Sequence, residues 1–199
     1  MFILSSLAQA DSSTVDENLW SFGMFMPWDF TYVKQDNGKG AYIFPFYGFG
    51  AYADYNNVEW SLYWQQVDYS SKSLQNYDNY AGHRYGSSLL YGFNPHFKAG
   101  TYVNQTEFIS TGKSSGYEKG TLLSYGLKML YNPNRPKEPE QKRTFQLNYM
   151  LSLGYLDGTD VKVYKRGYEF INGRLQEVSS KTYPDLSGYT FSLGLMSKF

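Results

Sequence analysis

The chain has 199 residues, the length of one domain, and its 18 basic and 18 acidic residues cancel to a formal net charge of zero. It contains no cysteine, so the composition excludes disulfides and thiol chemistry, and the neutral charge gives no reason to expect a nucleic-acid partner. Aromatic residues make up 20% of the chain, which favours strands and, through Tyr and Trp, a membrane–water boundary.

The N-terminal segment is short and apolar, and it ends in Ala8-Gln9-Ala10, which fits the small-x-small site of signal peptidase. No basic residue precedes this site. We interpret residues 1–10 as the remnant of a cleaved signal peptide and residues 11–199 as a single exported domain. An ordinary apolar N-terminus is the alternative.

Beyond the N-terminus, apolar and polar residues alternate with a period of two, and no long segment shows helical periodicity. In the clearest segment, Phe145, Leu147 and Tyr149 share one face, and Gln146 and Asn148 share the other. Each segment of this kind reaches the ~9–11 residues that a tilted strand needs to cross a membrane. The segments are residues 18–34, 41–55, 58–69, 79–93, 97–110, 120–131, 144–157 and 187–199. They predict an all-β, antiparallel up-and-down transmembrane barrel of about eight strands.

The connections form two alternating sets, one for each side of such a barrel. The first set contains Asn56-Asn57, Asn94-Pro95-His96 and the Pro-rich segment 132–143, and it lies on the side of both termini. The second set consists of residues 35–40, 70–78, 111–119 and 158–186.

The two shortest turns also predict the register of their strands. A two-residue turn at 56–57 pairs Ala53 with Trp60. A three-residue turn at 94–96 pairs Phe93 with Phe97 and Leu89 with Thr101. Both registers bring mostly apolar side chains together on one face, as correct pairing requires.

The last connection contains Asn172-Gly173, the strongest short hairpin signal. Folding about this turn pairs residues 161–171 with 174–183, and these segments then extend the last two strands beyond the membrane. The pairing sets odd residues against even ones, so one β-bulge is required where residues 158–160 face 184–186. A ten-stranded barrel that uses both segments as spanning strands is the alternative.

The C-terminal residues Ser192, Gly194 and Phe199 match the pattern polar-x-Gly-x-x-aromatic-x-aromatic, although Ser197 departs from it. Together with the strand count and the signal segment, they make the chain resemble the small bacterial outer-membrane β-barrel superfamily. The resemblance implies that the barrel-assembly machinery reads this terminal segment. It also implies an integral outer-membrane protein with periplasmic termini and an extracellular Asn172-Gly173 hairpin. The alternative is a soluble barrel such as a lipocalin, which turns its apolar face inward.

With the apolar face outward, the polar face fills the barrel lumen. Eight strands leave an interior that side chains can fill, and mixed charges there should pair because a lone buried charge is expensive. Arg84 and Lys128 are expected to face Glu59 and Asp54. The predicted lumen residues are Asp29, Asp54, Glu59, Tyr63, Gln65, Arg84, Tyr102, Asn104, Lys128, Gln146, Asn148 and Lys198. We expect a largely plugged lumen; a narrow path for a small or apolar solute is the alternative.

His83 and Glu107 are the candidate catalytic residues of a third hypothesis. The register places them side by side on the lipid face, as in the lipid A deacylase barrels, where a His-x-Ser motif stands beside a Glu. Here Tyr85 occupies the position of the serine, and Ser87 lies further into the membrane. The missing nucleophile argues against a lipid A-modifying enzyme.

The remaining expectations concern partners. Cations in the extracellular loops could bind the phosphates of lipopolysaccharide, or they are ordinary solvated charges. They are Lys34, Lys39, Lys72, Lys113, Lys119, Lys165, Arg166 and Arg174. We expect a monomeric, non-catalytic protein without metal or cofactor, with a structural role or a surface ligand bound through residues 158–186.

Overall fold

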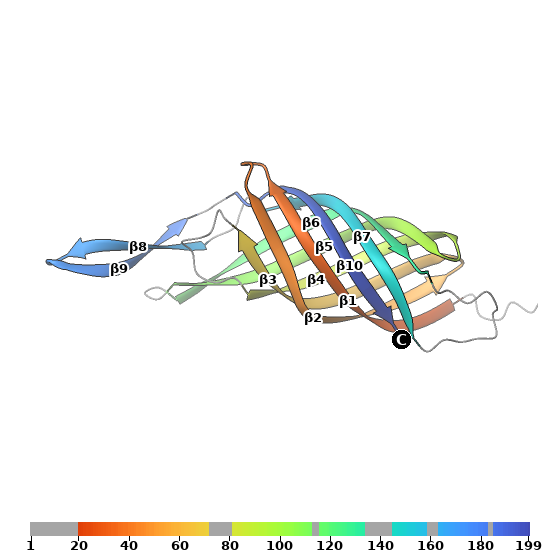
Figure 1. Cartoon of the computed structure of the whole chain (residues 1–199). Coiled ribbons are helices and arrows are strands. Elements are labelled where there is room, and N and C mark those ends of the chain that lie inside the picture. The colour runs from red at the N-terminus through yellow and green to blue at the C-terminus, as the bar shows by residue number, and fades with distance from the viewer. Residues whose placement is uncertain (1–19, 72–80, 113–115, 134–144, 159–162, 183–184) are drawn as a thin grey trace, which may run out of the picture.

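The computed structural model describes residues 20–71, 81–112, 116–133, 145–158, 163–182 and 185–199. Its strands are β1 (Trp20–Gln35), β2 (Gly40–Tyr55), β3 (Val58–Ser71), β4 (Ala81–Asn94), β5 (Phe97–Gly112), β6 (Gly116–Tyr131), β7 (Gln146–Asp157), β8 (Val163–Ile171), β9 (Arg174–Thr182) and β10 (Gly188–Lys198). Eight of them close an antiparallel barrel in the order β1-β10-β7-β6-β5-β4-β3-β2, and β8 and β9 form a separate two-stranded sheet (Figure 1). The predicted eight-stranded barrel is confirmed, and the ten-stranded alternative is wrong.

The two ends of the barrel differ in what they carry. The β7–β10 connection, with β8 and β9, extends from the end at which β1 leads into β2 (Figure 1). We call this the hairpin end. The other end holds the turns after β2 and β4 together with the C-terminus, and we call it the C-terminal end. The predicted signal remnant, residues 1–10, lies outside the described residues.

The predicted register holds along β2 and β3, where Ala53 pairs with Trp60. Asn56 and Asn57 both adopt positive φ, as a two-residue hairpin turn requires. Between β4 and β5 one pair differs from the prediction, because Phe97 pairs with Asn94 after a register shift that follows Gly92. Despite this shift, Phe97 still lies on the same face of the sheet as Ala99 and Thr101, as the sequence predicts.

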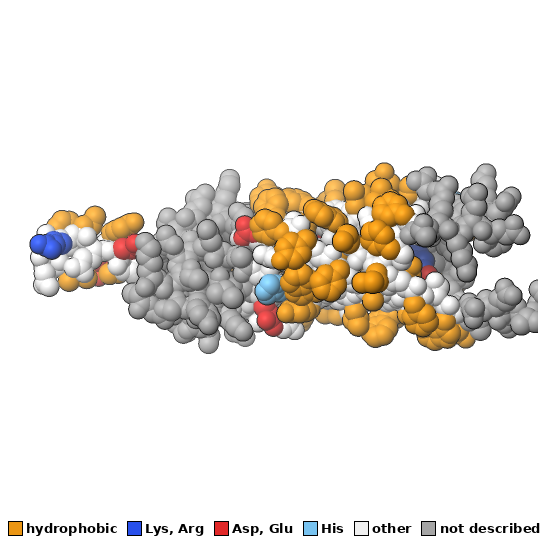
Figure 2. All heavy atoms as spheres, turned by 90° about the horizontal axis from the view of Figure 1, so that it is seen from below, with side chains coloured by type: hydrophobic (Ala, Val, Ile, Leu, Met, Phe, Trp, Pro, Cys, Tyr) orange, Lys and Arg blue, Asp and Glu red, His pale blue; other side chains and the backbone are white. Residues whose placement is uncertain are grey.

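The outer surface of the barrel is covered by large apolar side chains (Figure 2). On β1 the outward residues include Phe22, Met24 and Trp28, which are 72%, 60% and 49% exposed, and on β6 Leu127 is 63% exposed. A soluble barrel would bury such residues inside, so the lipocalin-like alternative is wrong. An apolar belt around a partly polar interior is the arrangement of a transmembrane barrel. No helix in the described ranges is long and apolar enough to cross a membrane.

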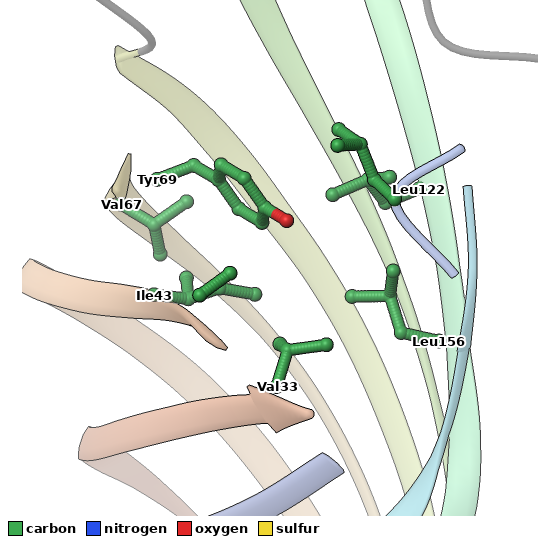
Figure 3. Close-up of a cluster of buried hydrophobic side chains, with 8 residues drawn as sticks. Val33, Ile43, Val67, Tyr69, Leu122 and Leu156 are labelled. Carbon is green, nitrogen blue, oxygen red and sulfur yellow. The ribbon is translucent and has the colours of Figure 1, made fainter. Parts of the chain in front are cut away.

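The interior is filled in layers that alternate in polarity. Along β3, charged Glu59 is followed by Tyr63, polar Gln65 and apolar Val67, all of which point inward and are buried. The C-terminal-side apolar layer consists of Phe25, Tyr63, Leu90, Leu130, Met150 and Met196. The hairpin-side apolar layer consists of Val33, Ala41, Ile43, Val67, Tyr69, Leu122, Leu156 and Leu186 (Figure 3). The lumen is therefore less polar than the sequence predicted.

Inward-facing glycines make room for aromatic rings in these layers. Tyr63 pairs across the strands with Gly86, and a Cβ atom added to Gly86 would lie 2.2 Å from Cζ of the Tyr63 ring. Tyr52 lies against Gly23 in the same way, with 2.6 Å to the added Cβ atom. Bulky rings thus fit inside a narrow barrel because the neighbouring strand contributes no side chain at that level.

The chain entering β10 caps the hairpin-side apolar layer. Leu186 is fully buried, and its backbone N–H donates to the carbonyl of Gly158 over 3.3 Å. Asp185 accepts a 2.9 Å hydrogen bond from the backbone N–H of Ser187. Hydrogen bonds from the Ser187 hydroxyl and backbone lower the pKa of Asp185, because they favour the ionised carboxylate. This bonded turn holds Leu186 in the mouth of the barrel.

The β8–β9 hairpin turns at Asn172 and Gly173, which both have positive φ, so the predicted hairpin turn is confirmed. Its ladder pairs Val163 with Thr182, odd with even, whereas the β7–β10 ladder pairs Leu156 with Gly188. The registers of the two ladders therefore differ by one residue, which is the offset that the predicted β-bulge would produce. They also belong to separate sheets, which corrects the prediction that the last two barrel strands continue into the hairpin.

Candidate functional sites

A buried charge cluster lies at the C-terminal end of the lumen. Glu59 is 1% exposed and accepts from the ammonium groups of both Lys98, over 2.9 Å, and Lys198. Lys98 also pairs with Asp54, which is nearer the solvent. Lys198 lies over the ring of Tyr52, 4.2 Å from its centroid. Two carboxylates and two ammonium groups thus neutralise one another across strands β2, β3, β5 and β10.

Sequence reasoning missed Lys98, although a signal for it was available. Lys98 has the same parity on β5 as Tyr102 and Asn104, which were both assigned to the lumen. Even-numbered residues of β5 point into the lumen, and this alternation already includes Lys98, the second residue of the strand.

A second buried ion pair crosses the middle of the lumen between the two apolar layers. Arg84, 2% exposed, donates from one terminal nitrogen to Asp29 over 2.7 Å. Gln65 donates to the other carboxylate oxygen of Asp29, also over 2.7 Å. Arg84 therefore pairs with Asp29 and not with Glu59 or Asp54, which corrects the predicted partners.

Lys128 is the other buried cation of the mid-lumen. Its side chain points inward from β6 and is 3% exposed, and its ammonium group lies 5.3 Å from the centroid of the Tyr63 ring. Among the described residues, no carboxylate forms an ion pair with Lys128. The predicted pairing with Glu59 or Asp54 is therefore wrong, and a cation–π contact holds this ammonium group instead.

Two further predicted lumen residues, Gln146 and Asn148, lie near the C-terminal end. Asn148 is 5% exposed and donates to the carbonyl of Met196 over 3.3 Å. Gln146 is partly buried and accepts a 3.3 Å hydrogen bond from Asn132. The predicted polar network of Asp54, Glu59, Arg84, Lys128, Gln146 and Asn148 thus faces inward throughout, but it divides into separate clusters because the C-terminal-side apolar layer intervenes.

The candidate catalytic pair is adjacent in register, since His83 pairs with Glu107 across β4 and β5. The His83 ring, however, stacks on Trp64 with 5.4 Å between ring centroids, and Glu107 accepts a 3.0 Å hydrogen bond from Gln105. Ser87 accepts a hydrogen bond from the indole of Trp60. These contacts assemble no nucleophile–base–acid relay among the described residues. Nor does any group of three His, Cys, Asp or Glu in that part of the chain suit a metal ion.

The proposed assembly signal lies on β10 and at the chain end. Ser192 points inward and forms a 2.8 Å hydrogen bond with Thr31, and Gly194 pairs with Asp29. Phe199 is 55% exposed and contacts the ring of Phe145, with 5.5 Å between centroids. The terminal aromatic residue thus belongs to the outer apolar surface.

The β8–β9 hairpin presents a second candidate site, made of apolar side chains. Tyr168, Phe170 and Leu175 are 67%, 76% and 61% exposed. Phe170 pairs directly with Leu175, and Tyr168 lies on the same face two residues away. This apolar face is set apart from the lipid-facing belt, because the hairpin extends beyond the barrel (Figure 1).

The fold is similar to solved outer-membrane barrels at low sequence identity. The crystal structure of Neisserial surface protein A (NspA) matches with a TM-score of 0.51 and 10% identity, over 92% of this chain and 98% of that one. The β domain of the Bordetella autotransporter BrkA and the outer membrane protein OprG from Pseudomonas aeruginosa each match 89% of this chain, with TM-scores of 0.37. Their identities are 9% and 14%, and 98% and 95% of those chains are covered. No protein-family model and no curated protein matches the sequence. The match to NspA shows the fold: a closed barrel of the outer-membrane type.

Proposed function

We propose that the chain is an integral protein of a bacterial outer membrane that presents the β8–β9 hairpin outside the cell as an interaction surface. What supports this proposal is the contrast between an interior packed with side chains, which we take as a largely plugged lumen, and an exposed apolar hairpin. Two apolar layers and two sets of paired charges occupy the interior. This packing disfavours the passage of a solute through the lumen. The hairpin, in contrast, offers large side chains to an external partner.

The absence of cysteine allows a direct test of this topology. Gln176→Cys places a thiol on the exposed hairpin, and His96→Cys places one in the turn at the opposite end. We expect a membrane-impermeant maleimide to label Gln176→Cys on intact cells and to label His96→Cys only after the outer membrane is permeabilised. The reverse pattern would contradict the proposal. The cysteine-free parent measures background labelling.

A narrow transport barrel is the second candidate, and one observation favours it. Lys128 and Arg84 are buried cations in the mid-lumen, and Nε of Arg84 has no hydrogen-bond partner among the described atoms. Such groups could receive a small solute that passes the apolar layers. Planar-bilayer recording separates the two functions: we expect no reproducible single-channel steps from the pure protein. Steps that Lys128→Met alters in size or selectivity would establish the transport function.

Delivery to the membrane follows from the same proposal. Residues 1–10 would be removed at the Ala10 site, and Ser192, Gly194 and Phe199 would present the terminal strand to the barrel-assembly machinery. The basic loop residues would rest against lipopolysaccharide phosphates, and the barrel would act as a monomer. Catalysis has no part in this proposal, since His83 and Glu107 are engaged by Trp64 and Gln105.

A further inference from the structure

Lys128 lies in the polar mid-lumen, which the two apolar layers enclose. On β6 it stands between Leu122 of the hairpin-side layer and Leu130 of the C-terminal-side layer, and it is 3% exposed. On the neighbouring strand β7, only Ser152 and Gly154 occupy inward-facing positions between the two layers. The strand beside Lys128 therefore contributes no large side chain at this level.

The charges of the lumen do not cancel. Among the described side chains, the lumen contains four cations and three carboxylates, which are Arg84, Lys98, Lys128, Lys198, Asp29, Asp54 and Glu59. Six of them form ion pairs with one another, whereas Lys128 forms none. The neighbouring ion pairs act electrostatically on its ammonium group, but each cluster is neutral in sum, so one positive charge stays uncompensated. A lone charge in a closed interior is strongly unfavourable.

A row of hydroxyl groups runs along the inner wall from Lys128. Lys128 pairs across the strands with Ser152, Ser152 with Ser192, and Ser192 with Thr31. The three hydroxyl residues are 7%, 4% and 5% exposed, so all of them are buried inside the barrel. Side chains that are directly opposed across strands begin about 5 Å apart, so this row is continuous and within reach of the ammonium group.

The hydrogen bonds of this row leave hydrogens available to a ligand. Oγ1 of Thr31 accepts from Nη2 of Arg84 over 3.4 Å and lies 2.8 Å from Oγ of Ser192. One hydroxyl hydrogen joins Thr31 to Ser192, and the second hydrogen of that pair remains free to donate. The hydroxyl of Ser152 forms no hydrogen bond with another described residue. An ammonium group and unused hydroxyl hydrogens thus converge at one level, with no carboxylate in the row.

We propose that the lumen encloses one small monovalent inorganic anion, of the halide class, held by the ammonium group of Lys128 and the hydroxyls of Ser152 and Ser192. Such an anion offsets the one excess positive charge and accepts charge-assisted hydrogen bonds from all three groups. Water would satisfy the hydrogen bonds but would leave the charge. The ion is bound when the barrel closes and is part of the fold, so the site does not depend on which side of the membrane the hairpin occupies.

The test is equilibrium urea unfolding of the full chain in lipid vesicles at fixed ionic strength, with sodium chloride replacing sodium gluconate. The anion can bind as the barrel folds, so the measurement needs no path into the closed lumen. Once chloride exceeds its dissociation constant, a further tenfold rise in chloride should raise the folded-to-unfolded ratio about tenfold. Lys128→Met should abolish this dependence, and Ser152→Ala should shift its onset to about tenfold higher chloride.

Ser124→Ala is the matched control. It makes the same change at an inward-facing position of β6, ~13 Å along the strand from Lys128, and should respond to chloride like the parent. Crystals grown in sodium bromide locate the ion: we expect one anomalous peak within hydrogen-bonding distance of Nζ of Lys128 and none there in Lys128→Met. Heat-modifiable electrophoretic mobility verifies that each variant retains its barrel.

Three outcomes would overturn the inference. The first is a parent that does not respond to chloride, and the second is an equal response in Lys128→Met, which would assign the effect to an adventitious ion only. The third is a bromide-free crystal site in which water surrounds Lys128 or its ammonium group turns to Oε1 of Glu59, an atom that has no partner among the described residues. Surface labelling of Gln176→Cys is independent of all three, so failure here is distinguishable from failure of the proposed function.

Discussion

Asp29→Asn is expected to lower the free energy of unfolding by about 3–5 kcal/mol, one of the largest effects of any conservative change in this chain. The substitution keeps the shape of the side chain but leaves the buried guanidinium of Arg84 without its carboxylate, 2.7 Å away. Arg84 lies between two apolar layers, where water is a poor substitute for the lost charge. Urea titration of the protein folded in lipid vesicles, followed by tryptophan fluorescence, measures the loss.

Asp54→Asn is the matched control for this substitution. Its carboxylate also pairs with a cation, the partly buried Lys98, but the Asp54 side chain is 25% exposed and Lys98 retains Glu59. We expect a loss below about 1 kcal/mol. An equally small loss in Asp29→Asn would mean that water or an ion reaches Arg84, which would contradict the proposed plugged lumen and favour the transport candidate.

Gly86→Ala is expected to destabilise the barrel by about 1–3 kcal/mol, although an added methyl group in a strand often stabilises. The new Cβ atom would lie 2.2 Å from the Tyr63 ring and 2.5 Å from Oδ1 of Asn104. The ring cannot move freely, because it is buried and its hydroxyl donates to Asn104 over 2.6 Å. The same unfolding titration in lipid measures the effect.

Gly92→Ala provides the control on the same strand and the same inward face. The nearest atom to its added Cβ is 3.4 Å away, an ordinary contact, so we expect little change. A double-mutant cycle with Tyr63→Ala identifies the cause: the cost of Gly86→Ala should shrink when the ring is removed. Equal costs with and without the ring would show that the Tyr63 contact is not responsible.

The strands, their faces and most of their pairing follow from local patterns in the sequence. A period of two identifies which residues share a face, and short turns fix the register between neighbours, so Ala53 opposite Trp60 and His83 opposite Glu107 could both be derived. The positive φ values at Asn172 and Gly173 were likewise encoded locally. These features depend on residues close in sequence or on the alternation of side chains between the two faces of every strand.

Which interior residues contact one another depends on the closed barrel and does not follow from the local sequence. Alternation shows that Arg84, Asp29 and Glu59 face the lumen, but strand tilt and stagger set their heights, and these follow from closing the whole barrel. Arg84 on β4 therefore pairs with Asp29 on β1, three strands away around the barrel. Glu59 on β3 pairs with Lys198 on β10, the last strand of the chain. The hairpin belongs to the same class: Asn172 and Gly173 specify its turn, but its separation from the barrel follows from the closure of the eight other strands into one sheet.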